Sequence, residues 1–120
     1  MKVRISKSVA FDAAHYLDGC PGGRPYARMH GHSFTLEATL EGEPDPKTGW
    51  VVDFADLAAA LEEIRADLDH RLLNEVEGLE RPTLENICAF VARRLRPRFA
   101  GLKQVRVARR SNGESCVLEI

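Results

Sequence analysis

This chain of 120 residues has few cysteines, no excess of either charge and no long apolar run. Its three cysteines form no C-x-x-C pair and cannot all be bridged, which argues for a reducing cytoplasm rather than a disulfide framework. It carries 17 basic and 18 acidic residues, a net charge of −1 that indicates no nucleic-acid partner. No apolar stretch approaches the roughly 20 residues of a membrane span, and the amino terminus lacks the apolar core of an export signal.

The composition is that of an ordinary globular protein, and the length suits one domain over residues 1–120. Alternation of apolar and polar residues predicts strands over 2–15 and from His30 to about Gly42. Steps of three and four predict a helix with a buried stripe from Phe54 to Leu68, capped by Asp53.

A second helix is expected to begin at Thr83 as its N-cap and to stop at Pro97. Two alternating runs follow, and Asn112-Gly113 between them predicts a type I′ hairpin. The order β-β-α-α-β-β indicates an α+β fold with a four-stranded antiparallel sheet. Its two open edges favour strand pairing between subunits.

Three histidines are candidates for one metal site. His30 and His32 are two residues apart in a strand, so both point to the face of Phe34. If the extended pattern continues, His15 lies on the inner face of the preceding strand; it could equally lie on the outside of a bend, because the alternation weakens at Ala13-Ala14. Three neutral imidazoles leave one tetrahedral position open, as in catalytic zinc sites. The alternative is that these are hydrogen-bonded or solvated histidines at strand ends.

Five motifs in chain order are similar to those of the 6-pyruvoyl-tetrahydropterin synthase family, and most of all to its bacterial branch, the 6-carboxytetrahydropterin synthases of the queuosine (7-deazaguanine) pathway. The motifs are Phe11-x-Ala13-Ala14-His15, His30-Gly31-His32, Gly49-x-Val51-Val52-Asp53-Phe54, Leu68-Asp69-His70-x-x-Leu73-Asn74 and Pro82-Thr83-x-Glu85-Asn86.

The resemblance implies the tunnelling fold, in which subunit sheets join into a barrel, usually as a homohexamer of two stacked trimers with sites between subunits. It implies zinc on His15, His30 and His32, binding the side-chain hydroxyls of dihydroneopterin triphosphate. It also implies a cysteine thiolate and an Asp-His pair as proton carriers, and Asp69 and His70 match that pair. As an alternative, Asp69-His70 is simply the end of a helix.

The chain departs from the family pattern at two places. The family cysteine precedes His-Gly-His by a few residues, where this chain has Tyr26, so Cys20 is the candidate thiol. The family glutamate that anchors the pterin is replaced by Arg109, which has only donors and would suit a phosphate or carboxylate. Glu114 is a displaced substitute for that glutamate.

Thr83 and Glu85 match positions that hold the pterin in the family. Both are also typical of a helix start, Thr83 as the N-cap and Glu85 as an acidic residue of the first turn.

The resulting expectation is a cytoplasmic zinc-dependent lyase that converts dihydroneopterin triphosphate to 6-carboxytetrahydropterin. The 6-pyruvoyl product is an alternative. A second alternative, motivated by the displaced cysteine, is retro-aldol cleavage of a pterin side chain. A third, motivated by Arg109, is a zinc-holding oligomeric binding module without turnover.

Overall fold

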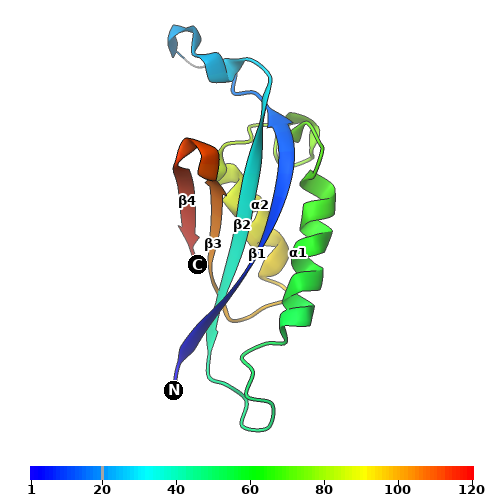
Figure 1. Cartoon of the computed structure of the whole chain (residues 1–120), viewed down its shortest axis with the longest axis vertical. Coiled ribbons are helices and arrows are strands. Elements are labelled where there is room, and N and C mark those ends of the chain that lie inside the picture. The colour runs from blue at the N-terminus through cyan, green and yellow to red at the C-terminus, as the bar shows by residue number, and fades with distance from the viewer. Residues whose placement is uncertain (20) are drawn as a thin grey trace.

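The computed structural model describes residues 1–19 and 21–120. One antiparallel sheet carries its strands in the order β1-β2-β3-β4, and both helices pack against the same face of it (Figure 1). The predicted α+β class and element order are confirmed. The elements are β1 Val3–His15, β2 His30–Gly42, α1 Phe54–Leu68, α2 Leu84–Leu95, β3 Leu102–Arg109 and β4 Glu114–Glu119.

The long hairpin of β1 and β2 is the spine of the molecule. Its strands pair without a break from Val3 opposite Gly42 to His15 opposite His30. Odd-numbered side chains of β1 and even-numbered ones of β2 turn toward the helices, so Phe11 and Phe34 stack with ring centroids 5.0 Å apart. Because the histidines at the end of the hairpin have the same parity, their side chains also lie on this inner face.

Both helices begin at the predicted caps. The Asp53 carboxylate accepts a hydrogen bond from the Ala55 amide, and the Thr83 hydroxyl accepts one from the Asn86 amide. One detail of the first helix is wrong: Phe54 was expected in the buried stripe but is 48% exposed. It is the helix's first residue and lines a surface hollow with Trp50 instead of the core.

The turn between β3 and β4 also differs from the prediction. A type I′ turn needs positive φ at both central residues, but Gly113 (φ 68°) alone adopts it here, and Asn112 does not. Four residues separate the paired Arg109 and Glu114, which leaves room for a right-handed turn that ends on a left-handed glycine. Among the described residues, no helix is long and apolar enough to cross a membrane.

Candidate metal centre and substrate cavity

The two strand ends bring His15, His30 and His32 together on the inner face of the sheet. Their ring centroids are 4.6 to 5.1 Å apart, and one ring nitrogen from each lies within 4.8 Å of the other two. His15 and His30 form the last pair of the β1–β2 ladder, and His32 lies on the same face of β2 as His30. The strand register alone therefore assembles the cluster.

Backbone carbonyls orient two of the imidazoles. His15 Nδ1 lies 2.9 Å from the Pro82 carbonyl oxygen, and His30 Nδ1 lies 2.6 Å from that of Arg28. A carbonyl oxygen only accepts, so each Nδ1 carries the proton and each Nε2 keeps its lone pair. This is the usual way in which proteins fix the tautomer of a metal-binding histidine.

The unsatisfied ring nitrogens of the cluster also fit a metal site. The Nε2 atoms of His15 and His32 are buried and have no hydrogen-bond partner among the described residues. Buried ring nitrogens normally find a partner, and three imidazole nitrogens are a donor set that zinc accepts. The residues present therefore fit the zinc ion that the resemblance implies.

Burial keeps two of these imidazoles, those of His15 and His32, in the neutral form. Burial lowers the pKa of His15, and the neighbouring charges of His30 and Arg109 lower it further against the Pro82 hydrogen bond. Burial, with the charges of His15 and Arg109, lowers the pKa of His32 to about 4. Neutral imidazole is the form that binds a metal, so no proton has to be displaced from these two rings at pH 7.

A cavity of about 450 Å³ opens beside the cluster. Its wall is formed by the loop before β2, by His30 and His32, and by the β3–β4 hairpin; the lining residues are Leu17, Pro25, Tyr26, His30, His32, Arg109, Asn112 and Glu114. A volume of this size is typical of small-molecule sites. Arg109 lines this cavity, as its shared parity with Val105 and Val107, four and two residues before it and buried in the core, had indicated. Its role in binding substrate stays a prediction.

The Asp69–His70 pair lies elsewhere, at the edge of the sheet beyond β1. His70 Nδ1 is 3.0 Å from Asp69 Oδ2, although adjacent residues rarely touch in this way. His70 has a left-handed backbone (φ 59°), which is unusual for a residue other than glycine. Asp69 also accepts a hydrogen bond from the Asp12 amide, the largest cause of its lowered pKa.

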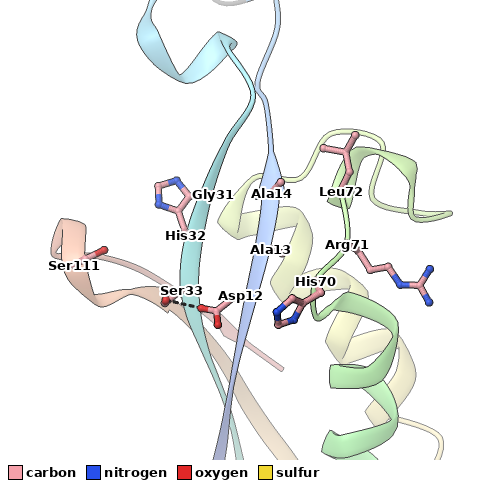
Figure 2. Close-up of a pocket in the computed structure, with 10 residues that line it drawn as sticks. All are labelled: Asp12, Ala13, Ala14, Gly31, His32, Ser33, His70, Arg71, Leu72 and Ser111. Atoms are coloured by element: carbon pink, nitrogen blue, oxygen red, sulfur yellow. Dashed lines mark hydrogen bonds between the residues drawn. The ribbon is translucent and has the colours of Figure 1, made fainter.

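The His70 imidazole is 79% exposed and lines a separate hollow of about 680 Å³. Figure 2 shows this hollow, with His70 beyond β1, His32 on the far side of β2, and the hydrogen bond from Ser33 to Asp12 between them. His32 thus borders both hollows, whereas His70 borders only this one. An exposed imidazole on a strained backbone marks a functional candidate.

The remaining predicted residues are not gathered at the cavity. Thr83 and Glu85 occupy the start of α2, and neither lines either hollow. Cys20 lies outside the described residues, so its predicted role as the base stays a prediction.

Sequence reasoning missed the groups that hold the cluster in place. The Pro82 and Arg28 carbonyls carry no side-chain signal that a pattern could reveal. Asn74 was visible within a motif, and its amide brackets the backbone of Tyr16, accepting from its N–H and donating to its carbonyl oxygen. This clamp fixes the residue that follows His15.

Residues 4–119 match the family model described as 6-pyruvoyl tetrahydropterin synthase. The chain belongs to this family. The predicted family is thereby confirmed, and the geometry of the three histidines can be considered in that context.

Two relatives of the same family carry different names. A dihydroneopterin monophosphate aldolase of Pyrococcus furiosus is 38% identical over 101 residues, which cover 84% of this chain and 82% of the relative. A 6-carboxy-5,6,7,8-tetrahydropterin synthase of Synechocystis is 38% identical over 96 residues, which cover 76% of this chain and 73% of the relative. Similarity alone therefore does not choose between the two reactions.

The fold itself has a close structural match. The structure of Caenorhabditis elegans 6-pyruvoyl tetrahydropterin synthase aligns with a TM-score of 0.89 at 23% identity, covering 100% of this chain and 96% of that one. The subunit therefore has the tunnelling fold.

Proposed function

We propose that residues 1–120 form one tunnelling-fold domain that acts as a zinc-dependent lyase on 7,8-dihydroneopterin triphosphate, making 6-carboxy-5,6,7,8-tetrahydropterin for queuosine (7-deazaguanine) biosynthesis. One observation carries the proposal: the two buried, unpartnered Nε2 atoms of His15 and His32, grouped with His30 beside an open cavity. The name of the Synechocystis relative supports this choice of product.

The three histidines would hold the zinc ion through one ring nitrogen each. Zinc bound there would supply Lewis-acid chemistry, polarising a hydroxyl or carbonyl oxygen of the pterin side chain. The protein's own contribution is orientation: the carbonyls of Pro82 and Arg28 hold two rings in one tautomer before substrate arrives. The cavity beside them would take the side chain and limit the access of water.

Proton transfer would fall to Cys20 and to the Asp69–His70 pair, the residues that match the family's carriers. Asp69 holds the His70 ring by Nδ1 at 3.0 Å, so Nε2 is left to exchange a proton with substrate. Removal of a side-chain proton would then allow triphosphate to leave. Addition of water at the first side-chain carbon and cleavage of its bond to the second would release a two-carbon aldehyde and leave the 6-carboxylate. The role of Cys20 rests on the resemblance alone.

The site would be completed by oligomerisation in the reducing cytoplasm, in which Cys88 and Cys116 stay free thiols. We propose a homohexamer of two stacked trimers in which subunit sheets join into a barrel. Support comes from the strand order, which leaves β1 and β4 as sheet edges in one subunit. The exposure of His70 supports a site shared between subunits.

A second candidate reaction is retro-aldol cleavage of the pterin side chain. Tyr26 lines the cavity four residues before His30, close to where the family places its cysteine. Its phenol would donate the proton that replaces the departing carbon fragment, a task that needs no thiolate. The Pyrococcus furiosus relative is named for an aldolase reaction, which supports this candidate.

Product identification separates the candidates. Zinc-loaded protein is incubated with dihydroneopterin triphosphate, and the products are identified by chromatography and mass spectrometry. A 6-carboxy product would support the first candidate, and a 6-hydroxymethyl product the second. No turnover by protein that binds zinc tightly would contradict both and favour a binding module.

The variants Cys20→Ala and Tyr26→Phe then assign the base. We expect Cys20→Ala to abolish formation of the 6-carboxy product, whereas Tyr26→Phe should abolish a 6-hydroxymethyl product. Full activity of Cys20→Ala would show that its assignment is wrong.

A further inference from the structure

Arg109 is the cationic side chain of the substrate cavity. It ends β3 on the inner face of the sheet, its side chain is only 15% exposed, and it shares the cavity wall with His30 and His32. Its guanidinium therefore faces the same cavity as two of the three clustered imidazoles. A largely buried guanidinium in this position needs an anionic partner.

Glu114 meets this need only in part. Its Oε1 lies 3.2 Å from Arg109 Nε, an ion-pair distance, yet Nε has no partner with hydrogen-bond geometry among the described residues. The Glu114 side chain is itself 51% exposed, at the turn end of the β3–β4 hairpin. The pair therefore holds the arginine along the cavity wall without a hydrogen bond to its Nε–H.

We propose that Arg109 forms an oxyanion subsite beside the three histidines, which takes a phosphate or carboxylate group carried next to the side-chain oxygens of the substrate. A guanidinium presents a planar fork of donors that matches either group in a bidentate manner. It cannot accept the N–H groups of a pterin edge.

The substrate chemistry agrees with this placement. In dihydroneopterin triphosphate the phosphate chain is attached to the carbon next to one that bears a hydroxyl. Hydroxyls held at the histidines would therefore bring the first phosphate to the neighbouring wall. In a 6-carboxypterin the carboxylate takes the place of the first hydroxyl-bearing carbon, so one of its oxygens would meet the histidines and the other would meet Arg109. The identity of the substrate rests on the proposed function, whereas the charge of the bound group rests on Arg109.

Binding of three fluorescent oxidised pterins tests the proposal without turnover. Neopterin, neopterin 3′-monophosphate and 6-carboxypterin are titrated into the full chain, with and without zinc, and quenching gives each Kd. We expect both anionic pterins, or one of them, to bind the wild-type chain more tightly than neopterin. Arg109→Gln should reduce that preference about tenfold or more, the usual effect of losing a charge-assisted hydrogen bond.

Arg110→Gln is the matched control, because it removes the same charge from an exposed neighbour that does not line the cavity. Arg110→Gln should change the preference for anionic pterins by no more than about twofold, because salt screens an exposed charge. Glu114→Gln should keep or strengthen the preference because it frees the arginine. If Arg109→Gln does not fold, Arg109→Lys retains the charge opposite Glu114 and should lose part of the preference.

The outcomes separate the two sources of the anion. Loss confined to the monophosphate assigns the subsite to phosphate, and loss confined to 6-carboxypterin assigns it to carboxylate. Equal binding of all three pterins by the wild-type chain would overturn the proposal. So would a proportional loss for all three in Arg109→Gln. Because turnover is not measured, failure of the proposed lyase reaction leaves this result unaffected.

Discussion

The histidine cluster and the Asp69–His70 pair are both predicted to act on one substrate, yet they are built in opposite ways. The cluster is pre-assembled: His15 is fully buried, and backbone carbonyls orient His15 and His30. His70 is held by a single carboxylate, on a left-handed backbone, with 79% of its side chain exposed. The chain thus contains one pre-assembled histidine cluster and one histidine that faces solvent.

This difference indicates a division of labour. Metal ligands must hold fixed distances, so a strand ladder and buried carbonyls suit them. A proton carrier needs access to substrate and a free ring nitrogen, which an exposed imidazole provides. Substitutions in the two places should therefore fail in different ways, and the following measurements test that expectation in order of expected effect.

The largest effect is expected from His32→Ala, which removes a ligand from the pre-assembled cluster. Loss of an outer-shell partner alone costs about 10- to 100-fold in metal affinity, so loss of a ligand should cost more than ~100-fold. Zinc affinity is measured by competition with a chromophoric chelator. His70→Ala is the control and should bind zinc like the wild-type chain. Unchanged affinity in His32→Ala would remove the cluster from consideration as a metal site.

His70→Ala should instead lower kcat by roughly 10²- to 10⁴-fold, the range for loss of a general acid or base. If sites are shared between subunits, refolding His70→Ala together with His32→Ala should restore activity, because mixed oligomers contain some sites with both intact halves. Each variant refolded alone is the control. Failure of the mixture to recover activity, despite exchange of subunits shown by native mass spectrometry, would place both halves of the site in one subunit.

Zinc removal should lower thermal stability, because only the folded chain contains the assembled cluster. At a free zinc concentration about 100-fold above Kd, binding contributes about 2.7 kcal/mol to the free energy of unfolding. For a chain of this size that is a rise in Tm of roughly 10 °C. Calorimetry with and without a chelator measures it. His32→Ala should lose the shift, and His70→Ala should keep it; a shift in both would show zinc bound elsewhere.

Much of this architecture was predictable because it follows from periodicity. Alternation along β1 and β2 predicted the inner face, and that face includes His15, His30 and His32. Phe54 and the hairpin turn were predicted wrongly for local reasons. A first-turn residue need not follow the stripe of its helix, and the strand register set a four-residue loop where Asn-Gly suggested a tighter one.

The predicted site residues also divide into those whose position follows from strand periodicity and those whose position depends on local or tertiary structure. The direction of side chains on strands followed from parity, as Arg109 shows by lining the cavity. The contact of Asp69 with His70 was not expected, because the side chains of adjacent residues rarely meet. The left-handed backbone of His70 also leaves no signature in the sequence. The carbonyls of Pro82 and Arg28 were missed because every residue carries one, and only tertiary structure selects which carbonyl meets a ring.

The smallest effect concerns the two helix caps, which separate a structural role from a functional one. Asp53→Ala and Thr83→Ala each remove one side-chain acceptor from a helix start, so each should lower stability by about 1 kcal/mol.

Thr83 follows Pro82, whose carbonyl orients His15, and the resemblance predicts that Thr83 helps to hold the pterin. Neither Thr83 nor Asp53 lines the cavity or the hollow of His70 within one chain, so Thr83 would meet the pterin only in a site shared between subunits. The resemblance gives Asp53, which caps α1, no such contact. Thr83→Ala should therefore also raise KM, by about tenfold if one neutral hydrogen bond is lost, whereas Asp53→Ala should leave KM unchanged. Equal KM values in the two variants, at matched loss of stability in urea, would reduce Thr83 to a helix cap.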